Sequence, residues 1–217
     1  MPADLHMIVL PGGGYATHAE HEAEPVAEWL RDVGVQASVF RYPLNVRHPL
    51  PLEALRAEIS RCRAAGARQV GLIGFSAGGH LAGLAALAPG AAPDQAVHCA
   101  VLGYAITSME TETYRPARLI LLGEDASPQL RRSTSLGALV TPGSPPFFVW
   151  HTAEDPYVSV EHAYLLASSL AASGVPHAAH VFTHGPHSLG LARGAGEAAS
   201  WTALAARWIR EQASPPG

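Results

Sequence analysis

The sequence alternates short apolar runs with longer segments that have helical spacing. The apolar runs cover residues 6–10, 35–42, 69–75, 96–104, 146–151 and 176–182. The helix-like segments cover residues 20–34, 52–65, 77–88, 161–173 and 195–212. Strands that alternate with helices of this length predict βαβ units and a mostly parallel sheet. Right-handed crossovers then place helices on both faces, so the sequence predicts an α/β fold.

Size and composition indicate one folded domain over residues 1–217. Hydrophobic residues make up 48% of the chain and charged residues only 15%, which argues against disorder. A net charge of −4 gives no basic surface for nucleic acid. No apolar stretch approaches the ~20 residues that a membrane span needs. The first residues lack the basic region of a signal peptide, so we expect no membrane partner and a cytoplasmic location.

Two features of the chain do not fit the regular pattern. Residues 105–144 hold many Ser, Thr and Pro, and we expect loops with short helices there that form at most a small cap or loop insertion. The cysteines, Cys62 and Cys99, fall in different predicted elements without a CxxC spacing. We interpret them as free thiols, and no metal site is predicted.

The segment "GFSAGG" lies where the strand at 69–75 ends and the helix at 77–88 begins. Gly74 and Gly78 flank Ser76 at the spacing of the G-x-S-x-G nucleophile elbow. Small neighbours let strand and helix approach each other while the turn lifts Ser76 above the strand end. The adjacent helix N-terminus favours negative charge there, so Ser76 is the predicted nucleophile.

A serine nucleophile needs a base, and the base needs an orienting acid. In α/β hydrolases these follow in the order Ser, acid, His. After the strand at 146–151, "HTAEDPYV" offers Asp155, with Glu154 as the alternative. After the strand at 176–182, "FTHGPHSLG" offers His187, with His184 as the alternative. We favour Asp155 because it begins a turn, and His187 because a Gly-Pro turn precedes it.

Acyl transfer also needs N–H donors for the developing oxyanion. One donor is expected from Ala77, which follows the nucleophile. The glycines after the first strand, "VLPGGGY", expose backbone N–H groups without a side chain in the way. We therefore assign Gly13 and Gly14 as further donors, with Gly12 as a spacer. His80 and His151 are interpreted as a packed polar residue and a strand-end residue.

Four motifs together resemble the acetyl-esterase and acetylxylan-esterase-like branch of the α/β-hydrolase superfamily. They are "LPGGGY", "IGFSAGGHLA", "PPFFVWHTAEDPYV" and "FTHGPHSLGLA", and the resemblance runs from about His6 to Trp208. It implies a compact sheet of about six strands with a small lid or none. It also implies the same triad and oxyanion donors as above. Pro11 departs from the related HGGG pattern, because it stands where the His would be.

The predicted activity is two-step hydrolysis of a short-chain acyl ester, acetyl first, without a metal or organic cofactor. Tyr15, Tyr104 and Tyr157 follow predicted strand ends, and we expect them to line the substrate pocket. The resemblance suggests an acetylated sugar as the small-molecule ester. An amide hydrolase of arylformamidase or peptidase type stays open as an alternative, as does a non-catalytic binding protein of the same fold. Oligomeric state is not predicted.

Overall fold

The structure is a computed structural model in which residues 4–213 are described. A sheet of six parallel strands forms its centre, in the order β2-β1-β3-β4-β5-β6. The strands are β1 (Leu5–Leu10), β2 (Gln36–Val39), β3 (Gln69–Phe75), β4 (Cys99–Gly103), β5 (Phe147–Thr152) and β6 (His177–Phe182). The predicted α/β class and the sheet of about six strands are confirmed.

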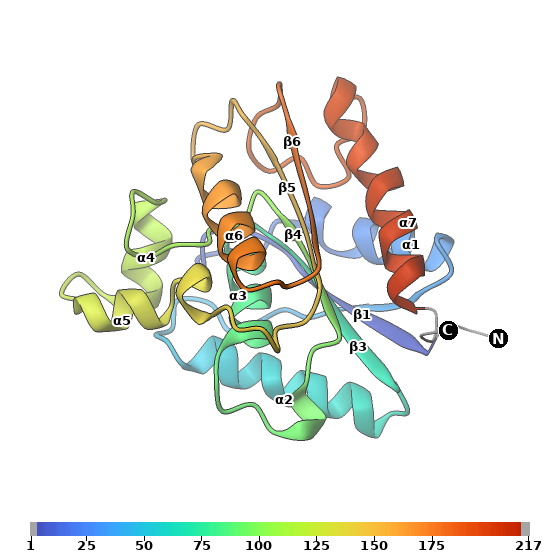
Figure 1. The fold of residues 1–217 in the computed structure, drawn as a ribbon, viewed down its shortest axis with the longest axis horizontal. Helices are drawn as coiled ribbons and strands as arrows, with labels where there is room; N and C mark the ends of the chain where they lie inside the picture. The colour runs from blue at the N-terminus through green and yellow to red at the C-terminus, as the bar shows by residue number, and fades with distance from the viewer. Residues whose placement is uncertain (1–3, 214–217) are drawn as a thin grey trace.

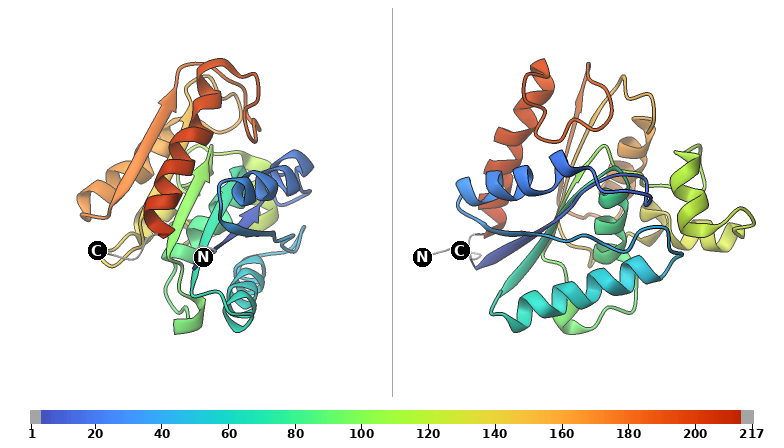
Figure 2. Two further views of the ribbon diagram at one scale, coloured as in Figure 1. Left: turned by 90° about the vertical axis from the view of Figure 1, so that its right-hand side faces the viewer. Right: turned by 180° about the vertical axis from the view of Figure 1, so that it is seen from behind.

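Helices cover both faces of the sheet (Figure 1). The α-helices are α1 (Glu24–Asp32), α2 (Leu50–Ala64), α3 (Ser76–Leu87), α4 (Arg115–Leu122), α5 (Pro128–Ser133), α6 (Glu161–Ala172) and α7 (Trp201–Ala213). The 3₁₀ helices are η1 (Glu20–Glu22), η2 (Pro93–Gln95), η3 (Leu136–Leu139) and η4 (Gly196–Ser200). Helices α1 and α7 share one face, and α2, α3 and α6 lie on the other (Figures 1 and 2).

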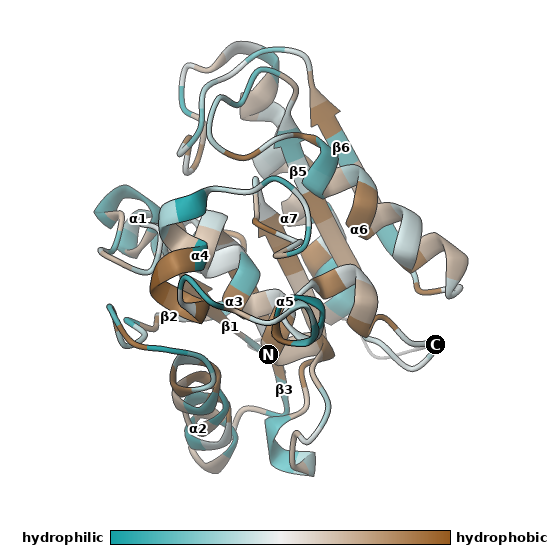
Figure 3. Ribbon diagram, turned by 90° about the vertical axis from the view of Figure 1, so that its left-hand side faces the viewer, coloured by the Kyte–Doolittle hydropathy of each residue, from teal (hydrophilic) through white to brown (hydrophobic). Residues whose placement is uncertain are grey.

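Alternate residues of the central strands fill two separate cores. In β1, Ile8 and Leu10 join the core beneath α2, α3 and α6, whereas Met7 and Val9 join the core beneath α1 and α7. This division follows from the two-residue repeat of a strand. Because both faces are covered, the central strands β3, β4 and β5 are mostly apolar and buried, and Figure 3 shows polar residues concentrated on helices and loops.

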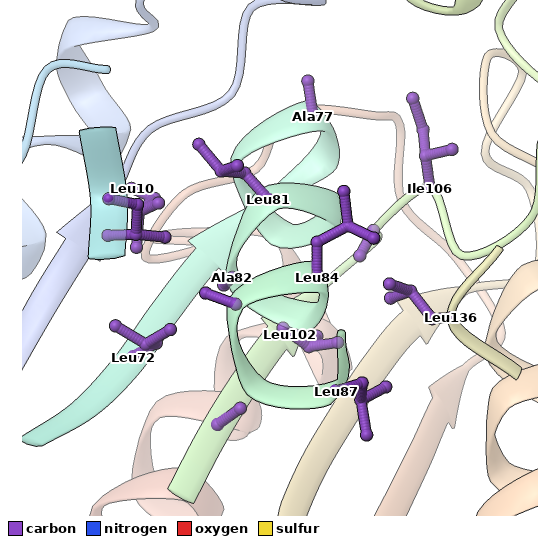
Figure 4. Close-up of a cluster of buried hydrophobic side chains, with 14 of the residues drawn as sticks. Leu10, Leu72, Ala77, Leu81, Ala82, Leu84, Leu87, Leu102, Ile106 and Leu136 are labelled. Carbon is purple, nitrogen blue, oxygen red and sulfur yellow. The ribbon is translucent and has the colours of Figure 1, made fainter. Parts of the chain in front are cut away.

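Helix α3 is buried along nearly its whole length, which explains its small residues. Its leucines pack against Leu72 of β3 and Leu102 of β4 (Figure 4). A Cβ at Gly74 would overlap the Gly78 carbonyl, and a Cβ at Gly78 would overlap the carbonyl of Leu10. Glycine therefore permits the backbone of α3 to lie directly against β3 and the end of β1.

Several elements differ from the sequence-based prediction. The helix expected at 20–34 is divided into η1 and α1 at Ala23, whose ψ of −107° is not helical, and the strand expected at 96–104 is limited to β4. The strand expected at 35–42 is limited to β2, because the chain after Val39 leaves the sheet edge and Tyr42 bonds to the Pro11 carbonyl. The helix expected from residue 195 begins instead with the 3₁₀ helix η4 and becomes α-helical at Trp201. The positive φ of Gly196, 58°, interrupts a continuous α-helix there.

The irregular segment at 105–144 contains the short helices α4, α5 and η3. Arg47 donates to the carbonyls of Leu119 and Ile120, at the C-terminal end of α4. The N–H of His48 bonds the Leu121 carbonyl at 2.9 Å. These contacts fasten α4 to the loop that precedes α2.

No helix among residues 4–213 has the length and apolar character that crossing a membrane requires.

The contact between α3 and β1 gives a test of this packing. Replacing Gly78 with Ala pushes a methyl group into two backbone carbonyls, those of Leu10 and Pro11. We expect Gly78→Ala to lower the free energy of unfolding by about 1–3 kcal/mol, as measured by urea denaturation. Gly143→Ala is the matched control, because a Cβ there meets no atom closer than 4.0 Å. Equal stability of the two variants would contradict this account.

Candidate active site

The site lies where the order of the sheet reverses. From β1 the chain passes to β2 on one side and then to β3 on the other. Ligands in open parallel sheets bind beyond the C-terminal strand ends at such a switch point. Leu10 of β1 is in register with Gly74 of β3, so the glycine loop and the elbow leave the sheet at the same level.

Ser76 is held at the first position of α3 in a strained conformation. Its φ is 50°, in the left-handed region that non-glycine residues rarely adopt. A Cβ at Gly12 would come within 3.1 Å of the Ser76 Cβ, so the glycine loop lies directly beside the hydroxyl. The predicted elbow geometry is present, and the N-terminus of α3 lies at Ser76.

Three side chains from distant parts of the chain form one hydrogen-bonded series. Ser76 Oγ lies 2.9 Å from His187 Nε2, and His187 Nδ1 lies 2.6 Å from Asp155 Oδ2. Asp155 follows β5, and His187 follows β6, which pairs with β5. The adjacent strands therefore bring the acid and the imidazole to the same sheet edge as Ser76.

The environment of Asp155 fixes the protons in this series. Its Oδ1 accepts N–H bonds from Tyr157 at 2.9 Å and Val158 at 3.0 Å. Burial raises the pKa of Asp155, but its hydrogen bonds from His187 and these two amides outweigh burial, so the pKa lies below its ordinary value. The ionised carboxylate can only accept, so Nδ1 of His187 carries the proton and Nε2 is free to accept from Ser76.

The alternative acid and base pair with each other away from Ser76. His184 Nδ1 lies 2.9 Å from Glu154 Oε1, and both side chains are mostly exposed. Such a pair contributes little to stability. The structure thus separates the candidates: Asp155 and His187 join Ser76, and their sequence neighbours do not.

The backbone around Ser76 offers unused donors. Gly12 donates its N–H to Glu22 Oε2 at 2.7 Å, whereas no described residue accepts from the N–H of Gly13 or Gly14. The N–H of Ala77 lies in the first turn of α3, where helical N–H groups have no partner within the helix. The three donors predicted for an oxyanion therefore remain available.

A pocket of about 290 Å³ opens beside Ser76 and His187. Its remaining walls come from the glycine loop, from the segment around α4 and from Tyr157. Residues that line it include Gly13, Gly14, Thr17, Tyr114, Ile120 and Tyr157. The volume is at the lower end of the range for small-molecule sites, so the pocket suits a small ligand.

The three predicted pocket tyrosines lie in different environments. Tyr157 is 61% exposed and lines the pocket, with its ring 5.8 Å from that of His187. The expectation that Tyr15 and Tyr104 line the pocket differs from the structure, which leaves each only 1% exposed. The Tyr15 hydroxyl lies 2.7 Å from His80 Nδ1, and the Tyr104 hydroxyl donates to Glu22. Both rings extend back into the core from the strand ends.

The other singled-out histidines are structural in this geometry. Nε2 of His80 lies 2.8 Å from the Thr134 carbonyl, so the ring joins α3 to the end of α5 and to Tyr15. Burial lowers the pKa of His80 to about 4, although the bond to Thr134 raises it. His151 is the penultimate residue of β5, and burial lowers its pKa to about 4 as well.

Sequence reasoning missed two residues of the site. Tyr114 lines the pocket from the irregular segment, and its ring lies 6.0 Å from that of Tyr157. Glu22, within the helix-like segment at 20–34, is fully buried beside the glycine loop. No periodicity in the sequence distinguishes either one. Among the described residues, no group of three or more His, Cys, Asp or Glu could hold a metal ion.

The sheet, the elbow and the Ser-His-Asp geometry define an α/β hydrolase. The BD-FAE family model matches residues 64–170. The acetyl ester-xyloside bifunctional hydrolase of Caldicellulosiruptor lactoaceticus superposes with a TM-score of 0.90 at 35% identity, over 95% of this chain and 82% of that one. A carboxylesterase of Lactobacillus plantarum superposes with a TM-score of 0.82 at 30% identity, over 98% of this chain and 87% of that one.

A curated relative extends the comparison. Endo-1,4-beta-xylanase B of Butyrivibrio fibrisolvens is 31% identical over an alignment of 207 residues that covers 86% of this chain. This chain spans 32% of the length of that relative. The chain belongs to the α/β-hydrolase superfamily, in the branch that contains acetyl esterases and carboxylesterases.

Burial of His80 predicts a pH dependence of stability. Its pKa is about 4 when folded against 6.5 when unfolded, so between these values the unfolded chain binds a proton that the folded chain does not. The contribution of neutral His80 to the free energy of unfolding is therefore complete above pH 6.5. It is lost as the pH falls toward 4, by about 3 kcal/mol in total. In urea denaturation, His80→Gln should flatten this slope by about 1.4 kcal/mol per pH unit.

The matched control for this measurement is His184→Gln, because that ring is exposed. It should keep the slope of the unsubstituted protein. A slope that His80→Gln leaves unchanged would show that His80 is protonated in the folded state.

Proposed function

We propose that this chain is a serine esterase that hydrolyses short-chain acyl esters, with Ser76, His187 and Asp155 as its catalytic triad. The observation that carries the proposal is the unbroken series from Ser76 Oγ through His187 to Asp155, at 2.9 and 2.6 Å. Its proton arrangement leaves His187 Nε2 ready to accept from Ser76. Two of the similar structures are, by name, a carboxylesterase and an acetyl ester-xyloside bifunctional hydrolase, which supports the same reaction type.

The reaction has two steps. Ser76 Oγ attacks the ester carbonyl carbon while His187 Nε2 takes the hydroxyl proton. The tetrahedral intermediate then expels the alcohol, which receives that proton from His187, and an acyl-Ser76 ester remains. Water then attacks this ester while His187 Nε2 takes one of its protons. The second tetrahedral intermediate expels Ser76 Oγ, which receives that proton from His187, and the carboxylic acid is released. Asp155 holds the imidazole in the required tautomer and stabilises its transient positive charge.

During the attack, negative charge develops on the carbonyl oxygen of the ester. We assign its stabilisation to the N–H groups of Gly13, Gly14 and Ala77. These donors are fixed by the glycine loop and the first turn of α3 before substrate arrives, so little reorganisation is needed during the reaction. One such donor contributes roughly 3 kcal/mol to transition-state stabilisation. The N-terminus of α3 adds to the same effect.

Pocket dimensions support a short acyl chain, acetyl first. The volume of about 290 Å³ must hold both sides of the ester. Tyr114 and the residues of α4 narrow it, and Arg47 fixes α4 in place. A longer acyl chain would have to displace this segment.

We propose an acetylated carbohydrate as the alcohol side of the substrate. The rings of Tyr157 and Tyr114 stand at 87° to each other beside His187, and Tyr157 is open to solvent. Such aromatic faces suit the apolar face of a sugar ring, and its hydroxyls would remain in water. Two of the relatives are, by name, an acetyl ester-xyloside hydrolase and a xylanase, which supports the same substrate class.

Hydrolysis of p-nitrophenyl esters from acetyl to octanoyl tests the acyl preference. We expect kcat/KM to be highest on acetate and at least about tenfold lower on octanoate. Ser76→Ala should abolish turnover and serves as the blank. Highest activity on octanoate would replace this proposal with a lipase-like one. Turnover of p-nitroacetanilide without any ester turnover would favour amide hydrolysis.

The acid of the triad has its own test. Asp155→Asn keeps the shape of the side chain but removes the charge and favours the wrong imidazole tautomer. We expect kcat on p-nitrophenyl acetate to fall roughly 10⁴-fold. The neighbouring Glu154→Gln is the matched control, and loss of its exposed ion pair should leave kcat within about twofold. A large loss of kcat in Glu154→Gln together with a small one in Asp155→Asn would instead identify Glu154 as the acid of the triad.

A further inference from the structure

Glu22 is a buried carboxylate that no step of the reaction uses. Its side chain is 1% exposed, and it lies in η1, beside the catalytic pocket. Taking a carboxylate out of water is costly unless hydrogen bonds and charges compensate for the lost hydration. The position of Glu22 therefore requires an explanation in terms of what it binds.

Three donors converge on the Glu22 carboxylate. Oε2 accepts the Gly12 N–H at 2.7 Å, and Oε1 accepts the hydroxyls of Tyr104 and Ser188, each at 2.7 Å. His21 Nε2 also lies 3.6 Å from Oε1. An ionised carboxylate can only accept, so these donors match its charged form.

Each donor belongs to a different part of the catalytic apparatus. Gly12 precedes the proposed oxyanion donors Gly13 and Gly14. Ser188 directly follows the proposed base, His187. Tyr104 directly follows β4, and its ring packs edge-on against His187 with centroids 5.0 Å apart. One carboxylate thus connects the loop that binds the oxyanion with the loop that carries the base.

The backbone at these positions is strained, which requires external restraint. The φ of Ser188 is 63° and that of Tyr104 is 35°, both in the left-handed region. Such conformations persist only where the surroundings fix them. The Glu22 bonds supply restraint at both positions, and the Gly190 N–H adds a bond to the Tyr104 hydroxyl at 2.8 Å.

We propose that Glu22 is a positioning residue, whose carboxylate sets the glycine loop and the His187 loop at a fixed separation. The inference rests on the proposed function, because it assigns those two loops to the oxyanion and the base. Glu22 borders the pocket, but the hydrogen bonds of its carboxylate go to Gly12, Tyr104 and Ser188 and not to Ser76 or His187. It acts through Gly12 on the oxyanion donors and through Ser188 on the imidazole.

Glu22→Gln tests the proposal, because it keeps the length of the side chain. An amide cannot accept all three bonds. If its oxygen accepts the Gly12 N–H, which can only donate, its NH₂ group faces the hydroxyls of Tyr104 and Ser188, which both donated to the carboxylate. A fluorophosphonate that titrates Ser76 gives the concentration of competent sites. We expect kcat per titrated site on p-nitrophenyl acetate to fall about 10–100-fold, since small displacements of catalytic groups have such effects. KM should stay within about threefold.

Ser188→Ala provides a second variant that leaves the buried carboxylate in place. It removes one half-buried hydroxyl, and kcat per titrated site should fall about 3–10-fold, a loss comparable to one hydrogen bond. Ser38→Ala is its matched control, since it removes a half-buried hydroxyl that bonds His6 at 2.8 Å on the edge strand. This control should lose stability without any change in kcat per site.

A purely structural role predicts a different result. Glu22→Gln and Ser188→Ala would then lower the melting temperature and the titrated fraction, while kcat per titrated site stayed within twofold of the unsubstituted protein. That outcome would overturn the proposal. If Glu22→Gln does not fold, the comparison of kcat per titrated site between Ser188→Ala and Ser38→Ala decides between the positioning role and the purely structural role.

Failure of the proposed function gives a distinct signature. The unsubstituted protein would then hydrolyse no ester, although the fluorophosphonate still labelled Ser76. In that case the second-order labelling rate replaces kcat, because phosphonylation also needs the base and the oxyanion donors. A labelling rate lowered at least about tenfold by Glu22→Gln would support the positioning role independently of the substrate, and an unchanged rate would refute it.

Discussion

The backbone of α3 lies against the C-terminal ends of β1 and β3 with no side chain between them. Glycines at 74 and 78 permit this contact, since a Cβ at either would overlap a backbone carbonyl. The contact turns the chain sharply enough to hold Ser76 at a positive φ above the sheet edge. It also brings the glycine loop beside the first turn of α3, so the Ser76 hydroxyl and the unused N–H groups lie close together.

The hydrogen bonds around Ser76 have fixed directions, because an ionised carboxylate can only accept hydrogen bonds and a backbone N–H can only donate them. Asp155 receives two backbone N–H bonds, stays ionised and fixes the proton on Nδ1 of His187. Glu22 receives three donors from segments on either side of Ser76. Two buried carboxylates thus hold the loops that approach the serine: Asp155 bonds the imidazole, and Glu22 bonds one backbone N–H and two hydroxyls.

Most of the fold and the central site could be predicted because they depend on local patterns. Apolar runs, helical spacing and the Gly-x-Ser-x-Gly spacing indicate elements and turns directly, and β3 begins and ends where predicted. The length of β2 and the start of α7 could not be predicted, because they depend on where the chain leaves its neighbours. Tyr15 and Tyr104 follow strands as expected, but long-range partners, His80 and Glu22, draw their hydroxyls inward.

The sequence by itself determined the order of strands and helices, the elbow and the candidates for each role in the triad. Periodicity and turn chemistry are written into neighbouring residues, so these features need no knowledge of distant contacts. Turn chemistry favoured Asp155 and His187, but only the tertiary structure decided that these two lie with Ser76 while Glu154 and His184 pair with each other. It alone also revealed Glu22, because burial of an acid depends on donors that lie up to 166 residues away along the chain.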